Sequence, residues 1–125
     1  QVEIAEQEKM GLWHHSLLDK AHPKKEARHL MTTAGDKAVI SEAGERIVQS
    51  VASAAEVQSH YQEHSWNTME IIAEGPKLAQ KINGEVFATV TDHDPEMSRR
   101  KGWIALQDHG KGCSVAFRHL RIRRN

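Results

Sequence analysis

Hydrophobic and polar residues alternate along much of the chain, and this pattern is typical of strands with one buried face. Residues 1–7, 66–74 and 85–91 show the alternation and are predicted to form strands, and strands are also predicted over residues 38–40, 46–51 and 77–82. Residues 11–18 fit either a further strand or a loop. Asn83-Gly84 favours a two-residue hairpin, because both positions tolerate a positive φ. Many short strands separated by turns indicate an all-β antiparallel sandwich.

Residues 102–118 are predicted to form two further strands joined by a glycine-rich turn. Ile104 and Leu106 would face the core, which leaves Gln107 and His109 together on the opposite face. Such a face suits a ligand, although an ordinary edge strand with a solvated polar side has the same pattern. The apolar positions change parity between residues 117 and 120, which predicts a β-bulge near residues 118–119.

One segment has helical character. Ser53 is followed three residues later by Glu56, which is the spacing of a capping box. Ala54, Val57 and Tyr61 then share one helical face, so a short helix is predicted over residues 53–61.

Composition narrows the function classes. Lys+Arg 17 equals Asp+Glu 17, so the chain lacks the basic excess that marks a nucleic-acid binder. No apolar run has the length of a membrane span. The single cysteine excludes an internal disulfide, whereas nine histidines offer candidate acids, bases or metal ligands.

The order of motifs in the second half resembles one family. The motifs are Trp66-Asn67, Gly75, Ile82-Asn83-Gly84, Asp92, Gly102-x-Ile104-Ala105-Leu106-Gln107-x-His109-Gly110, and Phe117-Arg118-x-Leu120-x-Ile122. This order is similar to that of the 3-keto-disaccharide hydrolase domain, formerly a domain of unknown function. The resemblance is placed in the C-terminal two-thirds of the chain, with Gln1–Ile4 and Gly11 similar to the central strand of the domain and the segment after it.

The resemblance implies a concanavalin A-like jelly roll that is incomplete at its N-terminus. Residues 1–125 are then expected to be a single β-sandwich domain, the C-terminal portion of a larger jelly roll. Either the chain pairs with another copy or partner, or the missing half belongs to a longer native chain. The family also implies a bacterial, carbohydrate-processing protein that is secreted or periplasmic.

The activity implied is cleavage or hydration of a 3-keto-glycoside. A ketone at C3 acidifies the neighbouring C2–H, so the glycosidic bond can break by elimination and water can add later. Such chemistry needs a base, an acid and a group that polarises the ketone. A non-catalytic carbohydrate-binding module on the same fold is the alternative, because one fold hosts both functions.

The resemblance assigns the acid–base role first to His109, with Glu3 as a carboxylate partner by family position. The family shows Glu and Gln around the first strand motif, whereas Gln1 and Glu3 have the reverse order here. His14 and His15 are adjacent, so only one of them can face a site from a strand, and His15 is taken as the third catalytic candidate.

Four residues are expected to contact the carbohydrate ligand. Gln107 would hydrogen-bond sugar hydroxyls or the ketone, and Arg118 would orient a hydroxyl or an anionic group. Lys81 could reach the cleft and Trp66 could stack on a sugar ring, although a solvated lysine and a packing tryptophan are the favoured explanations. No cofactor is expected. A divalent metal is compatible with histidine and carboxylate chemistry, but no HxH or HExxH spacing supports one.

Overall fold

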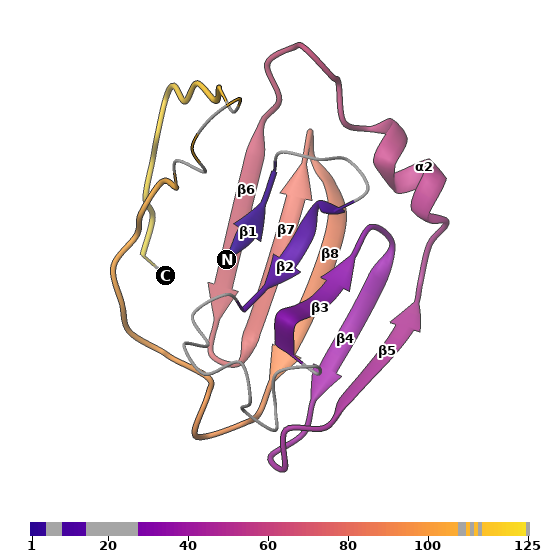
Figure 1. Cartoon of the computed structure of the whole chain (residues 1–125), viewed down its shortest axis with the longest axis vertical. Helices are drawn as coiled ribbons and strands as arrows, with labels where there is room; N and C mark the ends of the chain where they lie inside the picture. Colours follow the sequence, from indigo (N-terminus) through magenta and orange to yellow (C-terminus); the bar gives the residue numbers. More distant parts are fainter. Residues whose placement is uncertain (5–8, 15–27, 108–109, 111, 113, 125) are drawn as a thin grey trace.

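The structure is a computed structural model that describes residues 1–4, 9–14, 28–107, 110, 112 and 114–124. Its strands form two sheets that lie face to face (Figure 1). The three-stranded sheet has the order β1-β2-β3, with β1 Val2–Glu3, β2 Gly11–Trp13 and β3 Leu30–Thr33. The five-stranded sheet has the order β5-β4-β8-β7-β6. The predicted all-β sandwich is therefore confirmed.

The strands of the larger sheet lie close to the ranges predicted from alternation. They are β4 Asp36–Ile40, β5 Arg46–Ser50, β6 Met69–Glu74, β7 Lys77–Ile82 and β8 Glu85–Asp92. The pairs β4–β5, β6–β7 and β7–β8 are antiparallel, whereas β4 and β8 run parallel. This parallel pair departs from the fully antiparallel prediction. The long connection through β5, β6 and β7 allows it, because a parallel pair needs a crossover.

The hairpin between β7 and β8 has the predicted turn. Asn83 has a φ of 51° and Gly84 a φ of 92°, as a turn with two left-handed central residues requires. The Asn83 side chain also fixes the entry to β6, because its Oδ1 accepts a hydrogen bond from the Thr68 amide at 2.8 Å. Its Nδ2 donates to Asn67 Oδ1 at 2.8 Å. The Trp-Asn and Asn-Gly motifs therefore form one backbone-fixing unit.

The core lies between the sheets, and within the larger sheet its buried residues come from β4, β7 and β8, whereas every residue of β5 is exposed. Among the described residues, eleven hydrophobic ones are buried in this core: Met10, Leu12, Met31, Ala34, Ala38, Ile40, Val57, Ile82, Phe87, Ala88 and Val90. Gln80 is also buried, and its amide donates to the backbone oxygen of Glu3 in β1 at 3.3 Å. A bulge in β8 interrupts the alternation, so Phe87 is buried together with Ala88, and Val86 is exposed.

The predicted helix is α2 Ala54–Ser59, with Val57 buried against the core. Ser53 precedes the first helical residue as expected. However, its side chain makes no capping hydrogen bond, so the predicted capping box is absent. The first turn is closed instead by the backbone hydrogen bond from the Val57 amide to the Ser53 oxygen at 3.0 Å.

The C-terminal segment, residues 100–124, differs from the prediction. Its described residues belong to no strand, and their large apolar side chains are exposed. The segment runs beside β6 (Figure 1), with Arg100 hydrogen-bonded to the Gly75 oxygen after β6 and Arg118 stacked on Trp66 before it. The two predicted strands and the bulge near residues 118–119 are therefore wrong for the described residues. Alternation alone gives a segment no partner strand to pair with.

Candidate functional site

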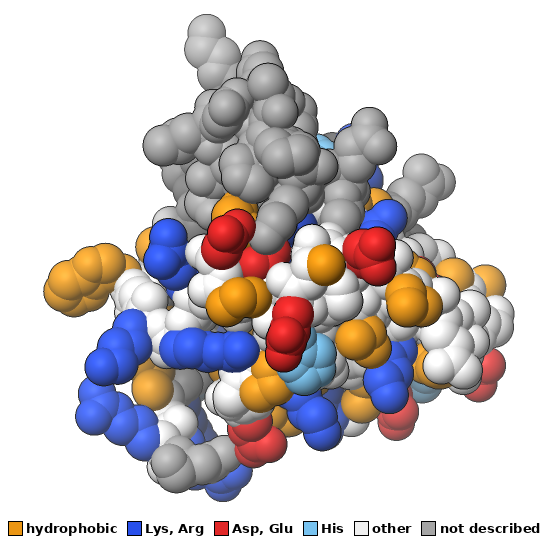
Figure 2. Space-filling model, turned by 90° about the horizontal axis from the view of Figure 1, so that it is seen from below, with side chains coloured by type: hydrophobic (Ala, Val, Ile, Leu, Met, Phe, Trp, Pro, Cys, Tyr) orange, Lys and Arg blue, Asp and Glu red, His pale blue; other side chains and the backbone are white. Residues whose placement is uncertain are grey.

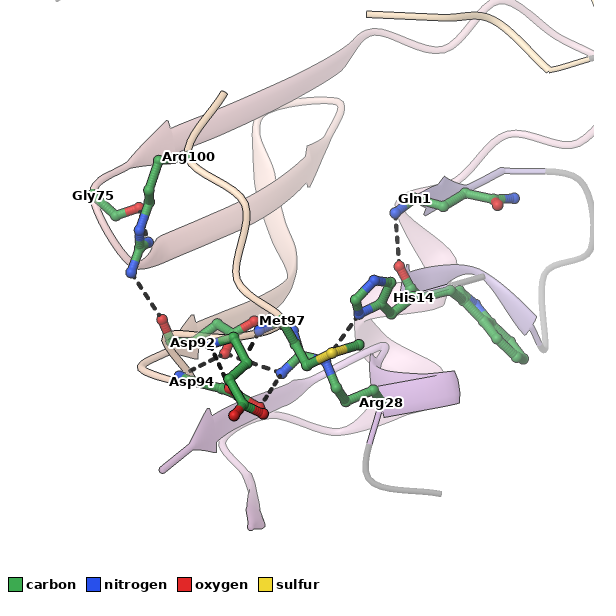
Figure 3. Close-up of polar contacts among 10 residues, drawn as sticks. Gln1, His14, Arg28, Gly75, Asp92, Asp94, Met97 and Arg100 are labelled. Atoms are coloured by element: carbon green, nitrogen blue, oxygen red, sulfur yellow. Dashed lines mark hydrogen bonds and ion pairs between the residues drawn. The ribbon is translucent and has the colours of Figure 1, made fainter. Parts of the chain in front are cut away.

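A buried polar cluster at the end of β8 is the strongest concentration of charged chemistry among the described residues. Arg28, which precedes β3, has 2% of its surface exposed. Its Nη1 donates to Asp92 Oδ1 at 3.1 Å, and its Nη2 contacts Asp92 Oδ2, which makes a bidentate pair (Figure 3). The second carboxylate, Asp94, lies with its Oδ2 at 3.6 Å from Nη1. One buried guanidinium is thus held by two carboxylates.

Local backbone contacts set the position of both carboxylates. Asp92 ends β8 in parallel register with Ile40 of β4, and the next amide, that of His93, donates to the Ile40 oxygen at 2.9 Å. Asp94 Oδ1 accepts from the amides of Glu96 at 3.0 Å and Met97 at 3.2 Å. The Asp-Pro turn therefore turns its aspartates inward, as short polar side chains that bond nearby backbone do.

His14 lies at the edge of this cluster, directly after β2. The Nε–H of Arg28 donates to His14 Nδ1 at 2.9 Å (Figure 3). A nitrogen that accepts this bond carries no proton, so the proton of the neutral imidazole is on Nε2. The half-buried ring therefore presents an N–H donor at Nε2, and its orientation is fixed from behind by a buried arginine.

The environment keeps this imidazole neutral. Burial and the adjacent Arg28 guanidinium lower the pKa of His14, and the N-terminal ammonium and Arg99 act in the same direction. Asp92 opposes the shift. A neutral imidazole with a fixed Nε2–H suits hydrogen-bond donation to a carbonyl or enolate oxygen, because donors fixed in advance need no reorganisation during a reaction.

Glu3 is the predicted catalytic carboxylate that the structure describes. It is half-buried in β1, and its Oε1 accepts from the Ile4 amide at 3.0 Å. Its Oε2 accepts from the Gln1 side-chain amide at 3.1 Å. These short-range bonds hold the carboxylate beside its own strand. The roles predicted for His15 and His109 fall outside the described residues and stay predictions.

The predicted sugar-contacting residues separate into two places. Trp66 and Arg118 come together, with the guanidinium carbon 3.9 Å from the ring centroid, so one face of Trp66 is covered by a cation. Lys81 lies elsewhere on β7, where its Nζ is 3.6 Å from Glu70 Oε2 of β6. Gln107 is exposed in the C-terminal segment and lies in no strand. Their ligand-binding roles stay predictions.

Metal binding finds no support within residues that the structure describes, since no group of three His, Cys, Asp or Glu side chains is arranged to hold an ion. The described helix is too short to span a bilayer. Sequence reasoning missed His14 and Arg28 as site candidates. The available signal was the Asp92-x-Asp94-Pro95 turn, whose paired carboxylates at a strand end need a buried cation.

Comparison with known families identifies the family of this chain. A family model described as the 3-keto-alpha-glucoside-1,2-lyase-like domain matches residues 3–123. The chain therefore belongs to this family, and the match covers nearly its whole length, not only the C-terminal two-thirds. No curated protein and no solved structure gives a significant match. The family supports a carbohydrate-related role, while the jelly-roll topology stays a prediction.

Proposed function

We propose that this domain cleaves 3-keto-α-glucosides by elimination across C1 and C2 of the oxidised sugar. The observation that carries the proposal is the family match over residues 3–123, which includes both the sandwich and the C-terminal segment. A base removes the proton from C2, and the electron pair forms the C1=C2 double bond. The C1–O bond breaks, and the departing oxygen takes a proton from an acid or from water.

The ketone at C3 makes this route accessible, because negative charge that develops at C2 spreads onto the C3 oxygen. A hydrogen-bond donor aimed at that oxygen stabilises the transition state more than the ground state. In our proposal His14 is this donor. The Arg28 bond to Nδ1 supports the assignment, since it leaves the Nε2–H free of Arg28 on the other side of the ring and disfavours the imidazolium.

The C2 base is His109 in this proposal, on the strength of the Gln107-x-His109 motif in the sequence. Glu3 and His15 are the other acid–base candidates, and Gln107 and Arg118 are proposed to contact the sugar. Later addition of water to the enone would complete hydrolysis of the glycoside. Each assignment is tested by substitution of its own residue.

The test is turnover of a 3-keto-α-glucoside, followed by aglycone release and by the ultraviolet absorbance of the enone. We expect His109→Ala to lower kcat by about 10²- to 10⁴-fold, the usual contribution of a general base. We expect His14→Ala to lower kcat by about 10²-fold, in the range for one lost oxyanion donor. His14→Gln retains an N–H donor near the Nε2 position and should recover part of this loss.

His60→Gln, an exposed histidine after α2, serves as the control and should leave turnover unchanged. Turnover that survives His109→Ala would remove His109 from the role of base. Saturable binding of the 3-keto-glucoside without aglycone release would favour the alternative, a carbohydrate-binding module.

A further inference from the structure

A hollow on the outer face of the five-stranded sheet has no role in the elimination chemistry. It has a volume of about 270 Å³ and lies on β4, β8 and β7. It is lined by Lys37, Lys77, Leu78, Ala79, Thr89, Val90 and Thr91. This face points away from the three-stranded sheet, because the alternate residues Ala38, Gln80 and Ala88 are buried in the core on the opposite side.

Strand register explains both the hollow and its lining. Thr89 lies on the central strand between Lys37 of β4 and Ala79 of β7, since it pairs with both. Thr91 lies one step along the same face and pairs with Lys77. Short side chains therefore form the floor, and the two long lysines stand at diagonally opposite corners of it. The short floor residues leave the volume that the lysines enclose.

The hollow carries positive charge that no ion pair between described residues neutralises. Within the described part of the chain, neither Lys37 nor Lys77 takes part in a salt bridge. The third lysine of this face, Lys81, contacts Glu70. Of the three lysines on this sheet face, Lys81 forms an ion pair outside the hollow, whereas Lys37 and Lys77 at its rim form none within the described residues.

We propose that this hollow binds one sugar unit that carries an anionic group, a carboxylate or a sulfate. The proposal rests on the carbohydrate role proposed above and adds a charge preference to it. Two ammonium groups at one site favour a single anionic group through charge-assisted hydrogen bonds. The threonine hydroxyls donate to and accept from sugar hydroxyls, and Ala79 allows a ring to approach the sheet. The volume lies just below the range of drug-sized pockets, which suits a single ring.

The Figure 2 view of the molecule from below shows lysine and arginine side chains gathered on the side where Figure 1 places the C-terminal segment. The described residues of the C-terminal segment belong to no strand, and Arg118, Arg121, Arg123 and Arg124 add positive charge there. Charge alone would attract an anion to either place, so the experiment must separate a site from a general effect of positive charge.

The test is a backbone amide shift titration of the whole chain with glucuronate, glucose 6-sulfate and glucose. We expect glucuronate or the sulfate to shift the amides of residues 77–79 and 89–91 in a saturable way, and glucose to shift them weakly. Lys77→Gln and Lys37→Gln should each weaken anion binding about tenfold, the loss of one charge-assisted contact. Lys101→Gln removes the same charge from the C-terminal segment and should leave Kd unchanged.

Comparison of the two anions identifies whether the carboxylate or the sulfate is preferred. Equal weakening by Lys101→Gln, or equal shifts with glucose, would overturn the proposal, because either result removes the specific role of the two lysines. The lyase proposal is judged separately by turnover of a neutral 3-keto-glucoside. Turnover without binding of either anion would refute the proposed anion site alone, and binding of either anion without turnover would refute the lyase activity alone.

Discussion

The β7–β8 hairpin and the C-terminal segment have the same alternation in sequence, but the hairpin buries most of its apolar side chains and the C-terminal segment exposes them. Ile82 in β7 is 1% exposed, whereas Ile122 in the C-terminal segment is 77% exposed. Phe87 in β8 is 1% exposed and Phe117 is 42% exposed. The side chains are the same, so the difference lies in what surrounds them.

The hairpin has two advantages that the C-terminal segment lacks. Its strands are adjacent in sequence and joined by a two-residue turn, so pairing requires little loop closure. Its inner face is also covered by the three-stranded sheet. The C-terminal segment follows the edge strand β6 and makes arginine contacts with the residues that flank it, Trp66 before the strand and Gly75 after it, without joining its ladder. Alternation alone therefore does not place a segment in the core. The segment also needs a partner strand to pair with and a layer that covers its apolar face.

The largest expected effect comes from removing the same side chain from both regions. Phe87→Ala should lower the free energy of unfolding by about 3–5 kcal/mol, because it leaves a cavity in the core. Phe117→Ala should change it by less than about 0.5 kcal/mol, as for an exposed position. Chemical denaturation of both variants measures the contrast. Equal losses would show that the C-terminal segment is packed in solution and would break the comparison.

Two arginines give the next contrast. Arg28→Met retains the aliphatic stem but leaves Asp92 and Asp94 without their cation, so we expect a loss of about 3 kcal/mol or more in unfolding free energy. Arg118→Met removes the stacking over Trp66 at the surface and should cost about 0.5–1 kcal/mol. Denaturant midpoints with unchanged m-values provide the measurement. A small effect of Arg28→Met would mean that the two carboxylates reach water when the arginine is lost.

The smallest expected effect is the pH dependence of the unfolding free energy that His14 causes, and His14 lies in the sandwich, not in the C-terminal segment. The pKa of His14 is lower in the folded protein than in the unfolded chain, so protons bind the unfolded state more readily. Stability should therefore fall as the pH drops through about 6.5, the ordinary histidine value, and this loss should level off below the folded pKa. His14→Gln should reduce the slope over this window. An unchanged slope in unfolding free energy against pH would contradict the assigned environment of His14.

Local sequence determined a large part of this protein. The hairpin at Asn83-Gly84, the short helix near residues 53–61 and the alternating strands of the larger sheet were all predictable. Each depends on residues within a few positions of one another, which is the range over which propensity and periodicity act. The motif order also indicated the family that matches residues 3–123.

Tertiary structure decided the rest. Arg28 meets Asp92 across 64 positions of sequence, β4 pairs parallel with β8, and one bulge buries Phe87 in place of Val86. These features depend on which strands meet and in what register, and no short window of sequence contains that information. The same reason explains the C-terminal segment, because its pattern specifies which side chains would face inward. Only the folded chain determines whether a partner strand is there to receive them.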